Sequence, residues 1–111
     1  NLLLHEMIHA VTSYAIDIYQ SDPQKLSEEM KRGVESLMAV YDRIKDDERF
    51  HGMNAVKNVK EMVASLGDYE FRKKLKLAGF WRNVLDSIRR FFGLRSVNNL
   101  YLAEDALERM I

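Results

Sequence analysis

Two histidines and a glutamate stand close together near the start of the chain, within the stretch NLLLHEMIHAVTSYAIDIY. On a helix, His5 and His9 lie on one face about 6 Å apart along the axis, so both imidazoles can bind one cation. Glu6 then lies beside that cation. A zinc-bound water has its pKa lowered towards neutrality, and an adjacent carboxylate can take its proton and pass it to a leaving amine. We therefore expect His5 and His9 to be zinc ligands and Glu6 to be the general base.

The same residues also have a purely structural interpretation. Two histidines on an apolar helix face can be hydrogen-bonded core residues, and a five-residue pattern with three fixed positions also arises by accident. Two of the three histidines of the chain fall in this pattern, however, and its flanks are apolar at Leu2, Leu3, Leu4, Met7, Ile8 and Val11. This context favours the metal interpretation, which is the H-E-x-x-H arrangement of metallopeptidases.

A catalytic zinc site normally has three protein ligands and a water, so a third donor must come from elsewhere in the chain. Because the chain has no cysteine, that donor is a histidine or a carboxylate. His51, in a predicted loop, is one candidate, and carboxylates on later helices are others. Glu61 is the most suggestive of these because it interrupts the apolar sequence VKEMVASL, where a carboxylate is costly unless it is paired or coordinated. The alternative is a solvent-facing glutamate that pairs with Lys57 or Lys60.

Helical periodicity dominates the remaining sequence, and no convincing alternating strand pattern is present. Asp22 and Pro23 are suited to cap and open the second helix, Gly67 to end the third, and Asp68 to cap the fourth. The predicted fold class is mostly α: a compact bundle of about six helices, with an H-E-x-x-H helix and a helix that carries the glutamate ligand. The expected helices span about 2–19, 23–45, 55–66, 68–79, 80–92 and 97–110.

Length and composition indicate a single domain, residues 1–111. A chain of 111 residues, 47% hydrophobic and 31% charged, can bury one modest core. Lysine plus arginine and aspartate plus glutamate both number 17, so the net charge is zero and we expect no nucleic acid partner. No apolar run approaches the length of a membrane span, so we expect a soluble domain. The chain begins at Asn1 without a methionine, and we expect it to be a fragment of a longer polypeptide.

The charges are nevertheless segregated along the sequence. Residues 68–95 contain eight basic and three acidic side chains, whereas residues 1–67 contain eight basic and eleven acidic ones. In the basic segment, arginines surround an apolar face made of Leu77, Trp81, Val84, Leu85, Ile88, Phe91 and Phe92. Such a face can lie on an anionic membrane or a partner, but it is more often core. We expect core here, and no membrane contact.

The segments HEMIHAVTSYAI and HGMNAVKNVKEMVASLGDYEFRKKL, with a long helix between them, resemble the gluzincin-type metallopeptidase domains found inside very large multidomain proteins of tailed phages and mobile elements. The resemblance covers about residues 2–77. In that family a helix resembling E-F-x-A-E follows the H-E-x-x-H helix and supplies a glutamate ligand. Met62 and Ala64 stand at the aromatic and alanine positions of this second motif. The roles that the resemblance implies are zinc ligands His5, His9 and Glu61 and general base Glu6.

The resemblance implies zinc-dependent hydrolysis of peptide bonds, with a peptide or protein substrate and the rest of the parent polypeptide as partners. By analogy, the substrate binds along an edge strand that precedes the first helix and is missing here. A phage origin is compatible with the virion and with the host cytoplasm, and the residues do not choose between these locations.

The chain departs from the family at Ser65, where a second acidic residue is expected, one that orients the ligands rather than binding the metal. Ser65 favours the alternative function, a non-catalytic helical interaction or virion-structural module that keeps a structural or relic metal site. The intact Glu6 favours the enzyme.

Overall fold

The H-E-x-x-H segment lies within one long, uninterrupted helix. The computed structural model describes residues 2–93, with side chains from residue 6 onwards. Helix α1 (Leu2–Ser21) has the predicted start and extends two residues beyond the predicted end. The prediction that Pro23 opens the next helix is wrong. Pro23–Lys25 form a separate 3-10 turn, η1, and α2 (Glu28–Ile44) begins after Ser27, whose Oγ accepts a hydrogen bond from the Met30 N–H.

The segment after α2 is built from short turns and shorter helices. Two 3-10 turns, η2 (Glu48–Phe50) and η3 (Asn54–Val56), lead into α3 (Val59–Ala64) and then η4 (Ser65–Gly67). Helix α3 begins four residues later than predicted because the Asn58 side chain accepts the Glu61 N–H and caps it there. Helices α4 (Tyr69–Ala78) and α5 (Trp81–Phe91) follow.

Five α-helices and no strand occur between residues 2 and 93, so the mostly α class is confirmed. The predicted sixth helix, residues 97–110, lies outside the described residues. Within the described part of the chain, no helix is both long enough and apolar enough to cross a membrane.

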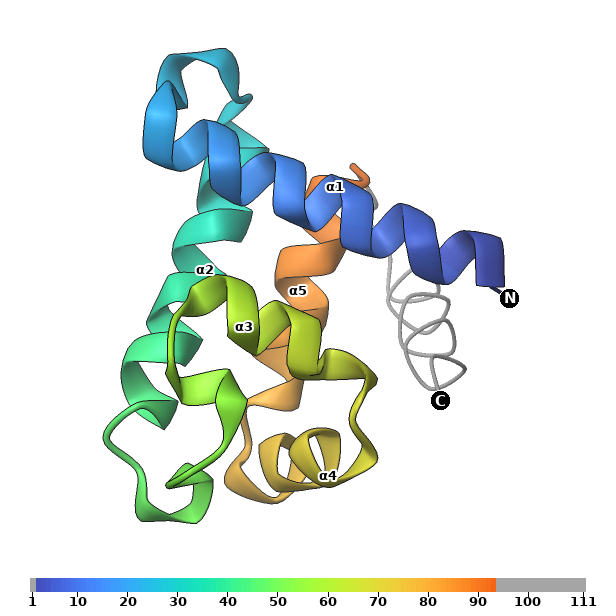
Figure 1. The fold of residues 1–111 in the computed structure, drawn as a ribbon. Helices are drawn as coiled ribbons and strands as arrows, with labels where there is room; N and C mark the ends of the chain where they lie inside the picture. Colours follow the sequence, from blue (N-terminus) through green and yellow to red (C-terminus); the bar gives the residue numbers. More distant parts are fainter. Residues whose placement is uncertain (1, 94–111) are drawn as a thin grey trace.

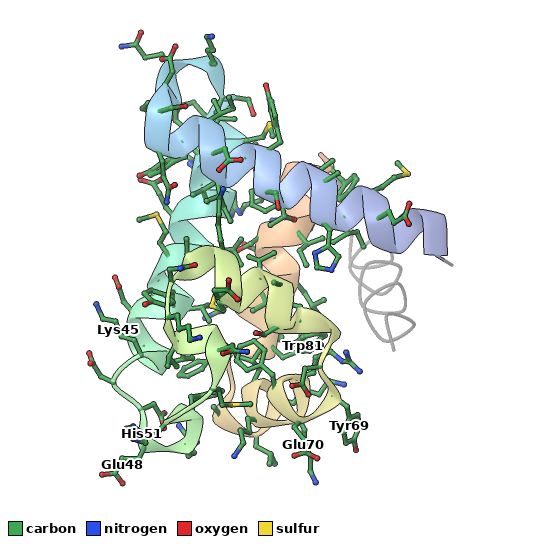
Figure 2. The ribbon with its side chains drawn as sticks, in the orientation of Figure 1. Lys45, Glu48, His51, Tyr69, Glu70 and Trp81 are labelled. Carbon is green, nitrogen blue, oxygen red and sulfur yellow. The ribbon has the colours of Figure 1, made fainter. Side chains whose placement is uncertain are left out.

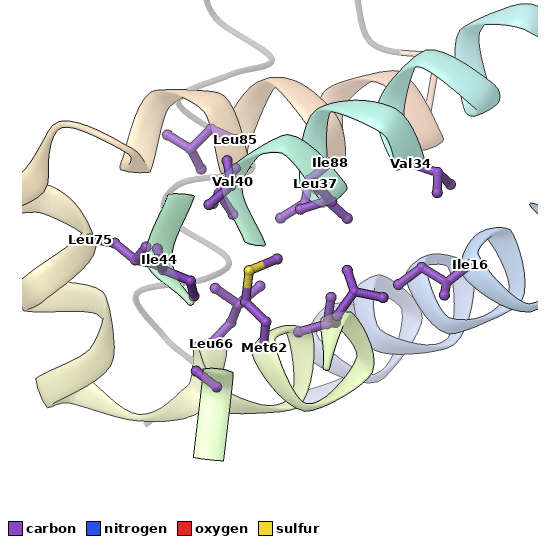
Figure 3. Close-up of a cluster of buried hydrophobic side chains, with 14 of the residues drawn as sticks. Ile16, Val34, Leu37, Val40, Ile44, Met62, Leu66, Leu75, Leu85 and Ile88 are labelled. Carbon is purple, nitrogen blue, oxygen red and sulfur yellow. The ribbon is translucent and has the colours of Figure 1, made fainter. Parts of the chain in front are cut away.

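The centre of the core lies between α2 and α5, which run antiparallel. Glu29, near the start of α2, pairs with Arg90, near the end of α5, at 2.9 Å. Gly33 permits the close approach of the two helices, since a Cβ atom there would lie only 2.6 Å from Phe91 Cε1. Figure 3 shows the apolar side chains that fill this core, among them Val34, Leu37, Val40, Ile44, Leu85 and Ile88.

Helix α1 crosses one end of the α2–α5 pair, and α3 lies against both α1 and α2 (Figure 1). The inner face of α1 is buried at Ile8, Thr12, Ala15 and Ile16. An ion pair between Lys60 of α3 and Asp17 of α1 joins the two helices. The two helices that carry the predicted metal ligands are therefore neighbours in the fold.

The apolar face predicted in the basic segment is core with one exception. Trp81, Val84, Leu85, Ile88 and Phe91 of α5 are buried, and Phe92 is half-buried. Leu77 is 76% exposed, so its assignment to that face is wrong. It lies near the end of α4, whose buried side is formed instead by Phe71, Arg72 and Leu75.

Candidate metal centre

His9 lies at the edge of the buried stripe of α1. One turn further along the helix, Thr12 is 1% exposed, and Ile16 after it is also buried. His9 itself is half-buried. A half-buried histidine can keep one side of its ring packed and still present a ring nitrogen to a ligand.

Thr12, which is not among the predicted site residues, adds a buried polar atom to this stripe. Its Oγ1 is buried, and no described residue forms a hydrogen bond with it. A buried hydroxyl without a partner costs about 1–3 kcal/mol. The signal in the sequence is its position three residues after His9, on the same helix face.

The other two members of the motif share the helix with His9. Glu6 is exposed, and no hydrogen bond or ion pair to its carboxylate occurs among the described residues. The backbone of His5 belongs to α1, while its side chain lies outside the described residues. The unbroken helix keeps a spacing of one turn, about 6 Å along the axis, between the two histidine positions.

Glu61 lies in the first turn of α3, and its side chain is exposed rather than set at the edge of a buried stripe. Lys60 pairs with Asp17 instead, and no ion pair joins Lys57 to Glu61. Asp17 lies eight residues after His9, about 12 Å along α1. The start of α3 therefore meets α1 about two turns away from His9, and the assignment of Glu61 as a ligand remains a prediction.

His51, the other candidate third ligand, lies far from α1. It directly follows η2 near Glu48, at the end of the molecule opposite α1, and it is exposed (Figure 2). The turn before His51 is held by hydrogen bonds between Arg49 and Asp47, which the sequence does not predict. Hydrogen bonds from the side chain and then the backbone of Arg49 lower the pKa of Asp47 to about 2. The distance from α1 is therefore the argument against His51 as the third ligand.

Ser65, the departure from the family pattern, has a local structural role. Its Oγ donates a hydrogen bond to the Glu61 carbonyl oxygen at 2.8 Å, within the last turn of α3. In the part of the chain with described side chains, residues 6–93, no three His, Asp or Glu side chains gather as a metal-binding group.

No family model, curated protein or solved structure matches the chain.

Proposed function

We propose that the chain is a zinc-dependent peptidase domain whose metal is held by His5 and His9 of α1. The observation that carries the proposal is the position of the H-E-x-x-H residues on one uninterrupted helix, with His9 at the edge of its buried stripe. This arrangement combines a rigid support, the half-buried imidazole of His9 and the exposed carboxylate of Glu6, about one helical turn before it.

Each residue of the proposed site has a separate chemical role. Zinc, when bound, supplies a Lewis acid that polarises the scissile carbonyl and lowers the pKa of its water. Glu6 is exposed and can reach both water and a substrate in the solvent. Its carboxylate accepts the proton of the attacking water and passes it to the leaving amine. Glu61, on the helix that contacts α1, is the proposed third ligand because its carboxylate has no partner among the described residues.

A Glu6→Gln variant separates this proposal from the alternative of a non-catalytic helical module. The substitution keeps the side-chain size but removes the base, so zinc content and thermal unfolding should stay unchanged. Hydrolysis of a mixed peptide library by the full-length polypeptide that carries this chain should fall by at least about a hundredfold.

Two results would count against the peptidase. Loss of zinc from the Glu6→Gln variant would make Glu6 a ligand rather than a base. Zinc binding by a full-length polypeptide that cleaves no peptide would favour a structural metal site.

A further inference from the structure

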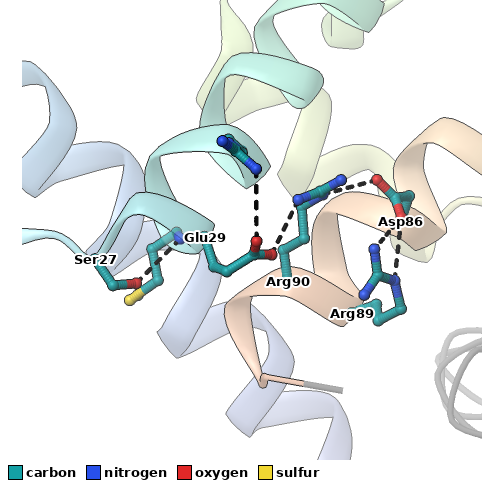
Figure 4. Close-up of polar contacts among 7 residues, drawn as sticks. Ser27, Glu29, Asp86, Arg89 and Arg90 are labelled. Carbon is teal, nitrogen blue, oxygen red and sulfur yellow. Dashed lines mark hydrogen bonds and ion pairs between the residues drawn. The ribbon is translucent and has the colours of Figure 1, made fainter. Parts of the chain in front are cut away.

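The basic surface around α4 and the start of α5 has cations that the fold does not neutralise. Arg89 and Arg90 lie in the same basic segment, but Asp86 pairs with both, and Glu29 pairs with Arg90 (Figure 4). In contrast, the cationic groups of Lys73, Lys74 and Arg82 form no ion pair with any described residue. Their positive charge is therefore available to a partner.

A hollow of about 260 Å³ lies on the side of α4, lined by Tyr69, Arg72, Lys73, Lys76 and Leu77. Arg72 is 1% exposed, and its Nη1 donates a hydrogen bond to the Leu66 carbonyl oxygen at 2.9 Å. Its Nε and Nη2 are buried and have no acceptor among the described residues. The guanidinium places a positive charge behind this hollow, but its donors are covered and do not reach the solvent.

A second hollow, of about 440 Å³, adjoins the first and shares Lys76 with it. Its other lining residues are Gly79, Trp81 and Arg82. The Lys76 Nζ lies 5.3 Å from the centroid of the Trp81 ring. Trp81 is 6% exposed, and its Nε1 is a second buried donor without an acceptor in the described part of the chain. Each hollow thus has an exposed cation on its lining, Lys73 in the first and Arg82 in the second.

We propose that the two hollows form one binding strip for the phosphodiester backbone of single-stranded nucleic acid. Phosphate oxygens would accept from Lys73 and Arg82, the exposed cations of the strip without an ion-pair partner among the described residues. Tyr69, 56% exposed at one end of the first hollow, offers a ring on which a base can stack (Figure 2). The zero net charge of the chain does not oppose this, because the positive charge is concentrated on one surface.

The shape of the surface favours a nucleic acid over a membrane. A membrane surface is contacted by protruding apolar side chains, and only Leu77 beside Tyr69 protrudes here. Two adjoining hollows that share a lysine instead suit a chain with repeated phosphates and bases. The strip is independent of the zinc proposal, since none of its residues belongs to the H-E-x-x-H motif.

The test is binding of a fluorescein-labelled oligothymidine of about 15 nucleotides, followed by anisotropy between about 50 and 200 mM salt. A Lys73→Glu/Arg82→Glu variant is compared with Arg43→Glu/Lys57→Glu, which changes the net charge equally at exposed residues outside the strip. Affinity should fall at least about tenfold in the first variant and less than about twofold in the control. The slope of log K against log salt should become shallower by about 1.4, from two lost phosphate contacts at about 0.7 each.

A Tyr69→Ala variant tests the stacking without adding charge, and its affinity should fall about tenfold with the salt slope unchanged. Because Tyr69 is exposed, this variant keeps the core intact. Equal losses in the strip variant and its control would overturn the proposal. So would the absence of oligonucleotide binding at low salt, including the case where the chain binds anionic lipid vesicles instead.

Discussion

At the scale of single residues, the positions of the candidate centre differ in how firmly the fold holds them. His9 and Thr12 share a buried stripe, so their backbone positions follow from the packing of α1. Glu61 has an exposed side chain, and the hydrogen bonds from its N–H to Asn58 and from Ser65 to its carbonyl oxygen hold only its backbone. The helix phase that exposes Glu61 depends on where α3 begins, and the cap at Asn58 decides that start.

The third ligand can be tested by comparing Glu61→Gln with His51→Gln. The first substitution should weaken zinc binding at least about tenfold, because a carboxylate that offsets half of the metal charge is replaced by a neutral amide. The second should change the affinity little, since His51 lies at the opposite end of the molecule from α1. Isothermal titration of zinc into both variants measures the difference, and equal affinity after Glu61→Gln would remove Glu61 from the ligand set.

At the scale of elements, the sequence predicts helices well where the signal is local. Asp68 accepts the Glu70 N–H, and Gly79, at φ 83°, ends α4, as its sequence indicates. Pro23 is a comparable signal, but Ser27 offers a side-chain cap four residues later and α2 begins there. Leu77 follows the apolar pattern of its neighbours yet stays exposed, because α4 turns Phe71 and Leu75 inwards. Which side of a short helix is buried depends on tertiary packing, and spacing alone does not determine it.

The contact between α2 and α5 predicts a cost for Gly33→Ala. Alanine would favour the helix by about 1 kcal/mol, but its Cβ would lie 2.6 Å from the Phe91 ring and 3.1 Å from the Ser87 carbonyl oxygen. Overpacking of this kind costs about 1–3 kcal/mol, so we expect a net destabilisation of about 1 kcal/mol in urea unfolding. In a Phe91→Leu background the same substitution should cost less, and an equal cost in both backgrounds would show that the ring is not the obstacle.

The ion pairs of Asp86 with Arg89 and Arg90, within α5, predict a dependence of stability on pH. Burial alone would raise the pKa of Asp86, but hydrogen bonds from Arg89 and then Arg90 outweigh it and keep this pKa below its usual 3.8. The stabilisation is therefore present above about pH 4 and is lost as the pH falls through the lowered pKa.

Asp86→Asn should lower the free energy of unfolding at neutral pH by about 0.5–1 kcal/mol, a modest value because the carboxylate is partly exposed to solvent. It should also flatten the loss of stability in acid. Asp42→Asn, at the exposed pair with Lys45, is the control. An Asp86→Asn variant with the wild-type pH profile would rule out this contribution.

At the scale of the whole molecule, the two candidate sites occupy different parts of the fold. The H-E-x-x-H motif lies on α1, which crosses one end of the α2–α5 pair, whereas the basic strip lies on α4 and the start of α5 (Figure 1). The motif is visible in the sequence because its residues lie within one helical turn. The strip is not, because it requires that Arg72 be buried and that Trp81 lie beneath Lys76.

Zinc titration of the purified chain tests the central claim, a metal site on α1, most directly. The wild-type chain should bind about one zinc ion, and His5→Ala and His9→Ala should each abolish tight binding, because one imidazole alone leaves too few ligands. Glu6→Gln, as the control, should bind as the wild type does. Retention of about one zinc per chain in the His5→Ala/His9→Ala double variant would contradict the claim.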